Sequence, residues 1–280
     1  MTLDFALDDF VSRVLAEDLG SGGDVTSKAT IPADARFTAI MNCRQAIVVA
    51  GLDVAAAFFR RLDPQVRLEP LVKDGDAIDP RTGLMRIEGN AQAMLAAERS
   101  ALNTLQHLSG IATLARQYVD AIAGTGAILL DTRKTIPGLR SLEKYAARMG
   151  GAQNHRMRLD DGVLIKDNHV AVCGGVAQAV ERAKAADTGL AVQVEVDRID
   201  QIEPALRAGA DRLLLDNMPP HVLREAVALV AKRVPLEASG GVTLETIQAI
   251  AQTGVDFISV GRITQSAPAV DIGMDYALQQ

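Results

Sequence analysis

The sequence predicts an α/β protein in which a mixed first domain is followed by a (β/α) barrel. Short apolar runs alternate with helical stretches from residue 127 onward, and a long amphipathic helix separates this region from the more β-rich first hundred residues. Strands that alternate with helices form parallel sheets. Because no dinucleotide-binding glycine fingerprint follows any of these strands, a barrel is favoured over a doubly wound sheet.

The first domain is expected to be mixed and mostly β. Short runs of apolar residues bounded by turn residues predict its strands. The expected elements are strands at 35–44, 46–51, 66–72 and 84–88 and a helix at 52–62.

A long helix is expected to end this domain. Apolar side chains recur at helical spacing from residue 91 to residue 123, with Gly110 interrupting the pattern and Gly124 and Gly126 ending it. We therefore place the first domain at residues 1–111 and the barrel at 112–267, and we allow residues 268–280 to return to the first domain.

Six apolar runs are expected to form the barrel strands, and four helical patterns lie between them. The strands are expected at 127–130, 162–165, 192–196, 212–215, 234–236 and 257–260. The helices are expected at 176–186, 199–208, 222–231 and 244–253.

The composition is that of a globular protein. A chain of 280 residues, 48% hydrophobic and 23% charged, can bury one large core or a large core plus a smaller domain. No apolar run approaches the roughly 20 residues of a membrane-spanning helix, and the acidic start does not resemble a signal peptide. Cys43 and Cys173 have no motif spacing, so neither a disulfide framework nor a zinc site is expected. These features predict a cytoplasmic protein with no membrane partner.

Charge is distributed unevenly along the chain. The net charge of −6 disfavours a nucleic-acid partner. The segment from Arg133 to Lys166 nevertheless contains eight basic and only three acidic residues. Such residues often lie on solvated helix faces. Several of these, however, directly follow predicted strands, which favours a site for an anionic substrate.

Reactive residues follow all six predicted barrel strands, where the loops of a (β/α) barrel build its active site. Polar residues that only mark the start of a loop would account for one or two strand ends, but not for six. In chain order the ends are Asp131-Thr132-Arg133-Lys134, Lys166-Asp167-Asn168-His169, Glu195-Val196-Asp197, Asp216-Asn217, Glu237-Ala238-Ser239-Gly240-Gly241 and Ser259-Val260-Gly261-Arg262.

The last two strand ends are glycine-containing turns. Such turns let main-chain N–H groups approach an anion closely, and (β/α) barrels often bind phosphate at their last two loops. A glycine pair alone is a weak signal, because it also occurs in ordinary turns. Two such turns at the final strands favour phosphate binding.

Glu195 and Asp216 are expected to end neighbouring strands beside the cationic segment. Two carboxylates in that position suit a divalent metal that bridges phosphate oxygens, as Mg²⁺ commonly does. Sugar binding, general acid–base duty and an ion pair with the basic residues are alternatives that the spacing leaves open.

A cluster of cationic side chains is expected at the first two strand ends and in the connection between them. Arginine binds carboxylates through two hydrogen bonds, whereas lysine acts as a point charge. The cluster suits a substrate with two adjacent carboxylates. Its members are Arg133, Lys134, His155, Arg156 and Lys166.

These residues also form a family signature. The block from Asp131 to His169, which contains DTRKTIPGLR, GG, NHR and IKDNH in that order, closely resembles quinolinate phosphoribosyltransferases. The likeness extends over nearly the whole chain, and this block is its most specific part. Further matching motifs lie at 17–20, 23–26, 98–99, 108–112, 194–196, 215–217 and 239–241.

The resemblance implies an N-terminal α/β domain packed on an open, seven-stranded (β/α) barrel of the type II phosphoribosyltransferase kind. It also implies a homodimer and a Mg²⁺-dependent reaction. Quinolinate and phosphoribosyl pyrophosphate would give nicotinate mononucleotide, pyrophosphate and CO₂ in de novo NAD synthesis. The seventh strand rests on the family, because the residue pattern predicts six.

Roles for individual residues follow from the same resemblance. Arg133, His155, Arg156 and Lys166 would surround the quinolinate carboxylates, and Arg99 would reach that site from the partner subunit. The catalytic residues would be Lys134, Glu195 and Asp216, which attend the phosphoribosyl donor, with Glu195 and Asp216 also holding the metal. The other substrate-binding residues would be Thr132, Ser239, Gly240, Gly241, Val260, Gly261 and Arg262.

Two alternative functions are weighed against this one. A paralogous family associated with molybdenum-transport gene clusters is similar, but it tends to lack the Lys-Asp-Asn-His motif found here at 166–169. A non-catalytic phosphometabolite-binding barrel would not need charged residues at all six strand ends.

Overall fold

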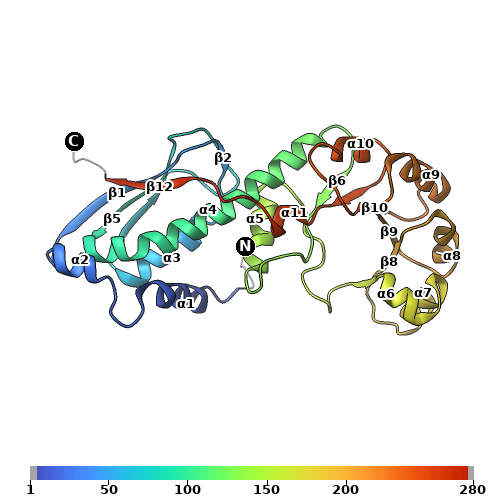
Figure 1. Ribbon diagram of the computed structural model, residues 1–280, viewed down its shortest axis with the longest axis horizontal. Helices are drawn as coiled ribbons and strands as arrows, with labels where there is room; N and C mark the ends of the chain where they lie inside the picture. The colour runs from blue at the N-terminus through green and yellow to red at the C-terminus, as the bar shows by residue number, and fades with distance from the viewer. Residues whose placement is uncertain (1–4, 277–280) are drawn as a thin grey trace. The chain divides into compact units, whose positions relative to one another are not determined.

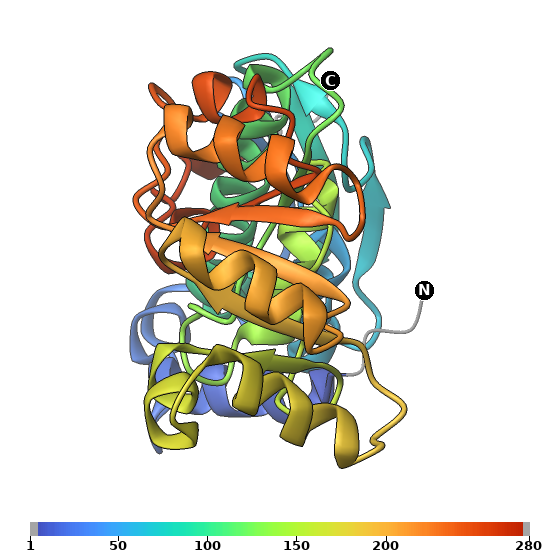
Figure 2. The same cartoon turned by 90° about the vertical axis from the view of Figure 1, so that its right-hand side faces the viewer.

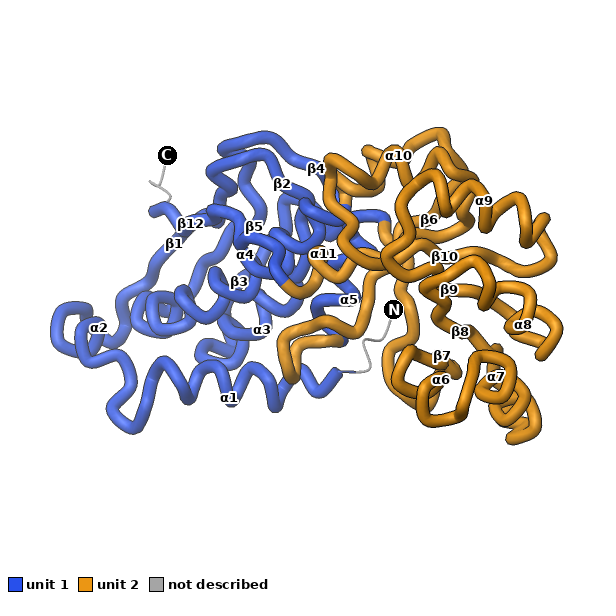
Figure 3. Tube along the Cα trace, turned by 45° about the vertical axis from the view of Figure 1, so that its right-hand side comes forward, with its two compact units in different colours: residues 1–115, 141–151, 266–280 blue, residues 116–140, 152–265 orange. Residues whose placement is uncertain are grey.

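The structure, a computed structural model, describes residues 5–276 and divides into two compact units (Figure 3). The first unit contains the chain up to residue 115, residues 141–151 and the chain from residue 266; the second contains residues 116–140 and 152–265. The division predicted after residue 111 lies inside the long helix α4 (Ala91–Ala121). The segment 141–151, which the sequence placed in the barrel, groups with the first unit.

The first unit contains a four-stranded antiparallel sheet with the strand order β12-β1-β5-β3 (Figure 1). Alternate residues of β1, Ala39, Met41 and Cys43, are fully buried, which is the pattern of a strand with one covered face. Strand β12 returns from the end of the described chain to pair with β1. The strands are β1 (Arg36–Cys43), β3 (Arg67–Pro70), β5 (Gly83–Asn90) and β12 (Ile272–Tyr276).

Short elements complete this unit. The helix predicted at 52–62 is found as α3, and the Asp74 carboxylate accepts hydrogen bonds from the main-chain N–H groups of Gly51 and Leu52 at its start. The strand predicted at 46–51 is wrong in length, because only two residues pair. The elements are α1 (Leu7–Leu19), α2 (Val25–Thr30), β2 (Ile47–Val48), α3 (Leu52–Leu62), β4 (Ala77–Ile78) and α5 (Arg140–Met149).

The long helix α4 runs without a break through Gly110, so the predicted interruption there is wrong. Its start is capped by Asn90, whose Oδ1 accepts the N–H of Ala93 at 3.0 Å. A Cβ atom at residue 110 would lie only 2.2 Å from the main-chain oxygen of Pro268. The glycine therefore permits close approach of the returning chain and does not end the helix.

Helix α5 was not predicted, because its buried face is partly charged. The side chains of Glu143 and Lys144 are fully buried beside Leu142, Ala146 and Ala147. Nε2 of His107 on α4 lies 2.9 Å from Glu143 Oε1, also within the first unit. An apolar periodicity cannot detect a helix whose inward positions are filled by a carboxylate and an ammonium group.

The second unit is built on a parallel sheet with the strand order β6-β11-β10-β9-β8-β7, so all six predicted strands are found. In place of the seventh strand, Gln153 forms a single parallel bridge with Leu130 of β6. The strands are β6 (Ile128–Leu130), β7 (Val163–Ile165), β8 (Val192–Val196), β9 (Arg212–Asp216), β10 (Leu236–Ser239) and β11 (Phe257–Ser259).

Helices connect these strands and lie on the outer side of the sheet (Figures 1 and 2). The four helical patterns of the sequence are found as α7, as η1 with α8, as α9 and as α10, whereas α6 directly after β7 and α11 after β11 were not predicted. Among residues 5–276, no helix is long and apolar enough to span a membrane. The helices are α6 (Asp167–Cys173), α7 (Val176–Ala185), η1 (Ile199–Gln201), α8 (Ile202–Arg207), α9 (Pro220–Val230), α10 (Ile247–Ala251) and α11 (Arg262–Gln265).

The close contact at Gly110 predicts that Gly110→Ala lowers the stability of the protein. Helix propensity alone would make Gly110→Ala stabilising by about 1 kcal/mol. The overlap with the Pro268 carbonyl should outweigh this and lower the free energy of unfolding by about 1–3 kcal/mol. Chemical denaturation checks the value. Gly22→Ala is the control, because its Cβ would lie 3.8 Å from Cγ1 of Val25, an ordinary contact distance. A Gly110→Ala protein as stable as the wild type would contradict the close approach.

Candidate active site

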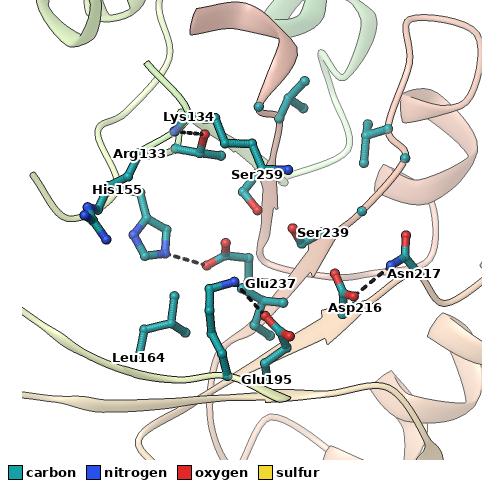
Figure 4. A pocket seen from close by; sticks show the side chains of 18 of the residues that line it. Arg133, Lys134, His155, Leu164, Glu195, Asp216, Asn217, Glu237, Ser239 and Ser259 are labelled. Carbon is teal, nitrogen blue, oxygen red and sulfur yellow. Dashed lines mark hydrogen bonds and ion pairs between the residues drawn. The ribbon is translucent and has the colours of Figure 1, made fainter. Parts of the chain in front are cut away.

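A cavity of about 710 Å³ lies at the carboxyl ends of the strands in the second unit (Figure 4). Parallel pairing aligns these ends at one edge of the sheet, so residues far apart in the sequence line a common space. The lining residues are Thr132, Arg133, Lys134, His155, Arg156, Leu164, Lys166, Asp167, Glu195, Leu214, Asp216, Asn217, Glu237, Ser239, Gly240, Gly241, Val242, Thr243, Ser259, Val260, Gly261, Arg262 and Gln265.

Of the site residues that the sequence proposed, the structure gathers all but Arg99 around this cavity. Arg99 lies on α4 in the first unit, with an exposed side chain. The neighbouring Glu98 is half-buried, and burial raises the pKa of its carboxyl, although Arg99 partly opposes this. Arg158, to which the sequence gave no role, forms an exposed ion pair with Asp160 and does not line the cavity.

One end of the cavity is cationic. Nε of Arg133 is buried and has no hydrogen-bond partner within the described residues. Arg156 donates a hydrogen bond from Nη1 to the main-chain oxygen of Gly162 at 2.9 Å. Burial, and after it repulsion from Arg133, lowers the pKa of the Arg156 guanidinium. A bound anion would relieve this repulsion and satisfy the buried donor.

Carboxylates stand next to the cationic end. Lys166 Nζ lies 3.0 Å from Glu195 Oε2, so the ion pair that the sequence left open is present. The pKa of Asp216 is raised, first by burial and then by the charge of Glu195. A hydrogen bond from Asn217 and the charges of Lys166 and Lys134 oppose this shift without cancelling it. The two carboxylates therefore repel each other in a place where a cation would be stabilised.

The two glycine turns pack tightly against neighbouring strand ends. Gly240 has a φ of 92°, and a Cβ there would lie 2.2 Å from Oδ1 of Asn217. Asn217 is itself left-handed, with a φ of 54°, and its N–H donates to the Ser239 oxygen at 2.9 Å. A Cβ at Gly261 would lie 2.8 Å from Cδ of Lys134. The left-handed main chain at residue 240 therefore favours glycine, whereas a Cβ at residue 261 would require the Lys134 side chain to move.

Comparison with known proteins identifies the family. The quinolinate phosphoribosyl transferase N-terminal domain matches residues 24–109, and the C-terminal domain of the same family matches residues 111–275. A nicotinate-nucleotide pyrophosphorylase (carboxylating) of Mycobacterium leprae is 43% identical over 272 residues, which cover 95% of this chain and 96% of the relative. The chain belongs to the quinolinate phosphoribosyl transferase family. The predicted enzyme class, a phosphoribosyltransferase, is thereby confirmed.

Solved structures of this family share the whole fold. The chain matches a nicotinate-nucleotide pyrophosphorylase of Ehrlichia chaffeensis with a TM-score of 0.94 and 38% identity, over 98% of this chain and 100% of that one. The match to the protein of Francisella tularensis has a TM-score of 0.93 and 39% identity, over 97% and 96% of the two chains. These matches confirm the predicted fold class.

Sequence reasoning assigned no role to two charged residues that line the cavity of this phosphoribosyltransferase, Asp167 and Glu237. Glu237 on β10 is fully buried and contacts His155, with Nε2 and Oε2 3.4 Å apart (Figure 4). Its place at the end of the fifth predicted strand was a signal that could have been used. The sequence did not show that its carboxylate turns inward.

The pKa of Asp216 is raised and that of Asp211 is lowered, so substitution of these two aspartates by asparagine should change stability in opposite directions. Because the pKa of Asp216 is higher in the folded protein than its ordinary value of 3.8, ionisation of this carboxyl destabilises the fold. The loss of stability begins as the pH rises above 3.8, grows until the pH reaches the folded-state pKa, and is constant above it. Asp216→Asn should therefore raise the melting temperature at pH 7, and this gain should shrink as the pH falls toward 3.8.

Asp211→Asn is the matched control. Burial opposes ionisation of Asp211, but hydrogen bonds from Lys184 and the Val192 N–H prevail and lower its pKa. Its substitution should lower the melting temperature at neutral pH, and this loss should diminish as the pH falls through the folded-state pKa. Thermal unfolding between pH 3.5 and 8 tests both signs, and a destabilised Asp216→Asn protein would contradict the electrostatic description.

Proposed function

We propose that this chain transfers the phosphoribosyl group of phosphoribosyl pyrophosphate to quinolinate with loss of CO₂. The products are nicotinate mononucleotide, pyrophosphate and CO₂, and the reaction belongs to de novo NAD synthesis. The observation that carries the proposal is a single cavity that joins a cationic end, a pair of carboxylates and two glycine turns. The names of the M. leprae and E. chaffeensis relatives support it.

Quinolinate, a pyridine with two adjacent carboxylates, fits the cationic end. Arg133, with its unpaired buried Nε, and Arg156, with its lowered pKa, offer guanidinium groups to the two carboxylates. Lys166 stands at the border of the two regions, where it pairs with Glu195. The cationic residues thus orient the ring so that its nitrogen faces the phosphoribosyl donor.

The phosphoribosyl donor fits the opposite side. The turns at Ser239–Gly241 and Val260–Arg262 line the cavity with main-chain groups suited to phosphate. As pyrophosphate leaves, positive charge develops on the ribose ring, and Glu195 and Asp216 can stabilise it. Lys134, whose main-chain oxygen accepts a hydrogen bond from Thr264 Oγ1 at 2.8 Å, is placed beside Gly261 to balance phosphate charge.

Decarboxylation follows from the same positioning. The ring nitrogen attacks the ribose carbon and becomes positively charged, so it can accept the electron pair of the adjacent carbon–carboxylate bond. CO₂ then leaves, and the ring carbon takes up a proton. The arginines hold the remaining carboxylate in place while the other is lost, and fixed geometry of this kind is worth about 7–11 kcal/mol of a barrier.

Magnesium is the cofactor that we propose for this cavity. Bound Mg²⁺ would neutralise charge on the pyrophosphate that leaves. Glu195 and Asp216 fit this ion, because Mg²⁺ uses one or two carboxylates and completes its shell with phosphate and water. Burial first, and then repulsion from Glu195, raises the pKa of Asp216, and a bound cation would relieve both effects. Within residues 5–276 no larger group of His, Cys, Asp or Glu side chains could hold a metal.

A homodimer in which Arg99 of the partner subunit completes the quinolinate site is also part of the proposal. The exposed side chain of Arg99 on α4 supports a role toward another chain. An isologous dimer would give each subunit the same contribution from its partner. The cytoplasmic location expected from the sequence stays a prediction.

A substrate assay tests the proposed function. With phosphoribosyl pyrophosphate and Mg²⁺, quinolinate should give nicotinate mononucleotide and CO₂. Nicotinate has one carboxylate and would leave buried cations unpaired, at a cost of about 3–5 kcal/mol, so its kcat/KM should be at least about 100-fold lower. Product detection by chromatography checks both. If neither quinolinate nor nicotinate gave a product, the proposed function would be refuted. If both acids were used equally well, the dicarboxylate site would be refuted.

The metal proposal predicts a selective loss in Glu195→Gln. Without this carboxylate, kcat at limiting Mg²⁺ should fall about 10²-fold or more, while quinolinate binding measured by calorimetry should change little. Asp197→Asn is the matched control, because Asp197 follows the same strand, is exposed and does not line the cavity. Wild-type turnover of Glu195→Gln at limiting Mg²⁺ would remove Glu195 from the metal site.

The shared site predicts complementation between two inactive variants. Arg99→Ala and Lys166→Ala should each retain little activity, because each lacks a cation of the quinolinate site. Mixed dimers should regain up to one working site of two, measured as product formed after co-refolding. Arg60→Ala, another exposed arginine of the first unit, should stay active by itself. Demonstrated heterodimers without regained activity would show that Arg99 does not act across the interface.

A further inference from the structure

A buried carboxylate beneath the cationic end of the cavity collects three contacts on one oxygen. Glu237 on β10 is fully buried, and its Oε2 accepts a hydrogen bond from Gln193 Nε2 at 2.8 Å. Arg212 Nη2 lies 3.2 Å from the same oxygen. His155 Nε2 lies 3.4 Å from it (Figure 4). Strands β8, β9 and β10 supply Gln193, Arg212 and Glu237, and Glu237 lines the cavity together with His155.

Glu237 is ionised despite its burial. Desolvation alone would raise its pKa, but His155 first, then Arg212 and Gln193, outweigh it and lower the pKa. Arg212 is fixed from its other side, with its guanidinium carbon 3.8 Å from the ring centroid of Phe257. A fixed negative charge is therefore held beside Nε2 of the His155 imidazole.

Both ring nitrogens of His155 have protein partners. Nδ1 accepts the main-chain N–H of Arg156 at 2.8 Å, so Nδ1 carries no proton. The ring proton is then on Nε2, which faces Glu237. The main-chain N–H of His155 donates to Asp131 Oδ1 at 2.8 Å. This arrangement leaves no ring N–H group of His155 for a substrate carboxylate.

We propose that Glu237 is a positioning residue that acts through His155 on Arg156. The carboxylate holds the proton on Nε2 of His155, and Nδ1 thereby stays an acceptor for the Arg156 N–H. This contact fixes the main chain from which the Arg156 side chain extends toward quinolinate. His155 is then a positioning residue too, and not a direct ligand of the substrate. That the ligand of Arg156 is quinolinate rests on the proposed function, whereas the tautomer of His155 does not.

Nitrogen NMR of the four histidines tests the tautomer without any substrate. In ¹⁵N-histidine-labelled protein at pH 7.5, the signals that disappear in His155→Asn identify His155. A protonated Nε2 with a proton-free Nδ1 is the expected result. A proton on Nδ1, alone or on both nitrogens, would overturn the proposal, even if the enzyme turns out to act on another substrate.

Two substitutions at His155 separate its two contacts. In His155→Asn, the amide oxygen takes the position of Nδ1 and still accepts the Arg156 N–H. In His155→Gln, the amide nitrogen takes the position of Nε2, so that only the donor to Glu237 is kept. KM for quinolinate should rise about tenfold or more in His155→Gln and clearly less in His155→Asn. KM for phosphoribosyl pyrophosphate should stay within about twofold in both. Equal losses would instead indicate a direct contact of the imidazole with substrate.

Substitution of Glu237 needs a paired change, since its removal alone would leave Arg212 buried and unpaired. Glu237→Leu together with Arg212→Leu removes both charges and keeps a packed interior. This double variant should have a higher KM for quinolinate than the wild type. Glu237→Gln combined with Arg212→Leu should bring KM most of the way back to the wild-type value, because the amide oxygen still accepts a hydrogen bond from His155. Circular dichroism confirms that both are folded. Unchanged quinolinate KM in the double-leucine variant would overturn the role of Glu237.

Discussion

Parallel hydrogen bonding between the barrel strands is the constraint on which the site depends. The register sets Glu195 opposite Leu214 on β9, and Ser239 of β10 opposite Asp216. All strands of a parallel sheet point in the same direction, so their carboxyl ends meet at one edge. Side chains that are separated by a helix and a loop along the chain therefore become neighbours. A shift in this register would separate the carboxylates from the phosphate-binding turns.

Unpaired charge is concentrated where these strand ends meet. Arg133 keeps a buried nitrogen without a partner in the described part of the chain, and Asp216 is held beside Glu195 although both are acids. Each of these arrangements reduces the stability of the protein alone. Both would be relieved when anionic substrates and a cation fill the cavity. The site thus exchanges some stability of the empty fold for affinity.

Buried polar groups also hold neighbouring parts of the protein in place. In the barrel interior Gln193 and Arg212 both contact Glu237, although Arg212 Nε and Glu237 Oε1 have no hydrogen-bond partner among the described residues. Inside the first unit, Glu143 pairs with His107. Their contacts fix side chains and the main chain in single orientations. The Glu237 cluster shows how such an interior can determine the direction of a residue at the cavity above it.

The sequence by itself determined the alternation of strands and helices in the second unit, all six barrel strands, the strand ends that line the cavity and the family. These features are recorded locally, as apolar periodicity and as contiguous motifs such as the block from Asp131 to His169. The sequence did not predict α5, because the buried face of this helix is partly charged. It wrongly predicted a break at Gly110, where the glycine instead allows the close approach of Pro268. Only the tertiary structure decided that Lys166 pairs with Glu195 and that Glu237 lies beneath His155. Those partners are far apart along the chain, and only the pairing of strands brings them into contact.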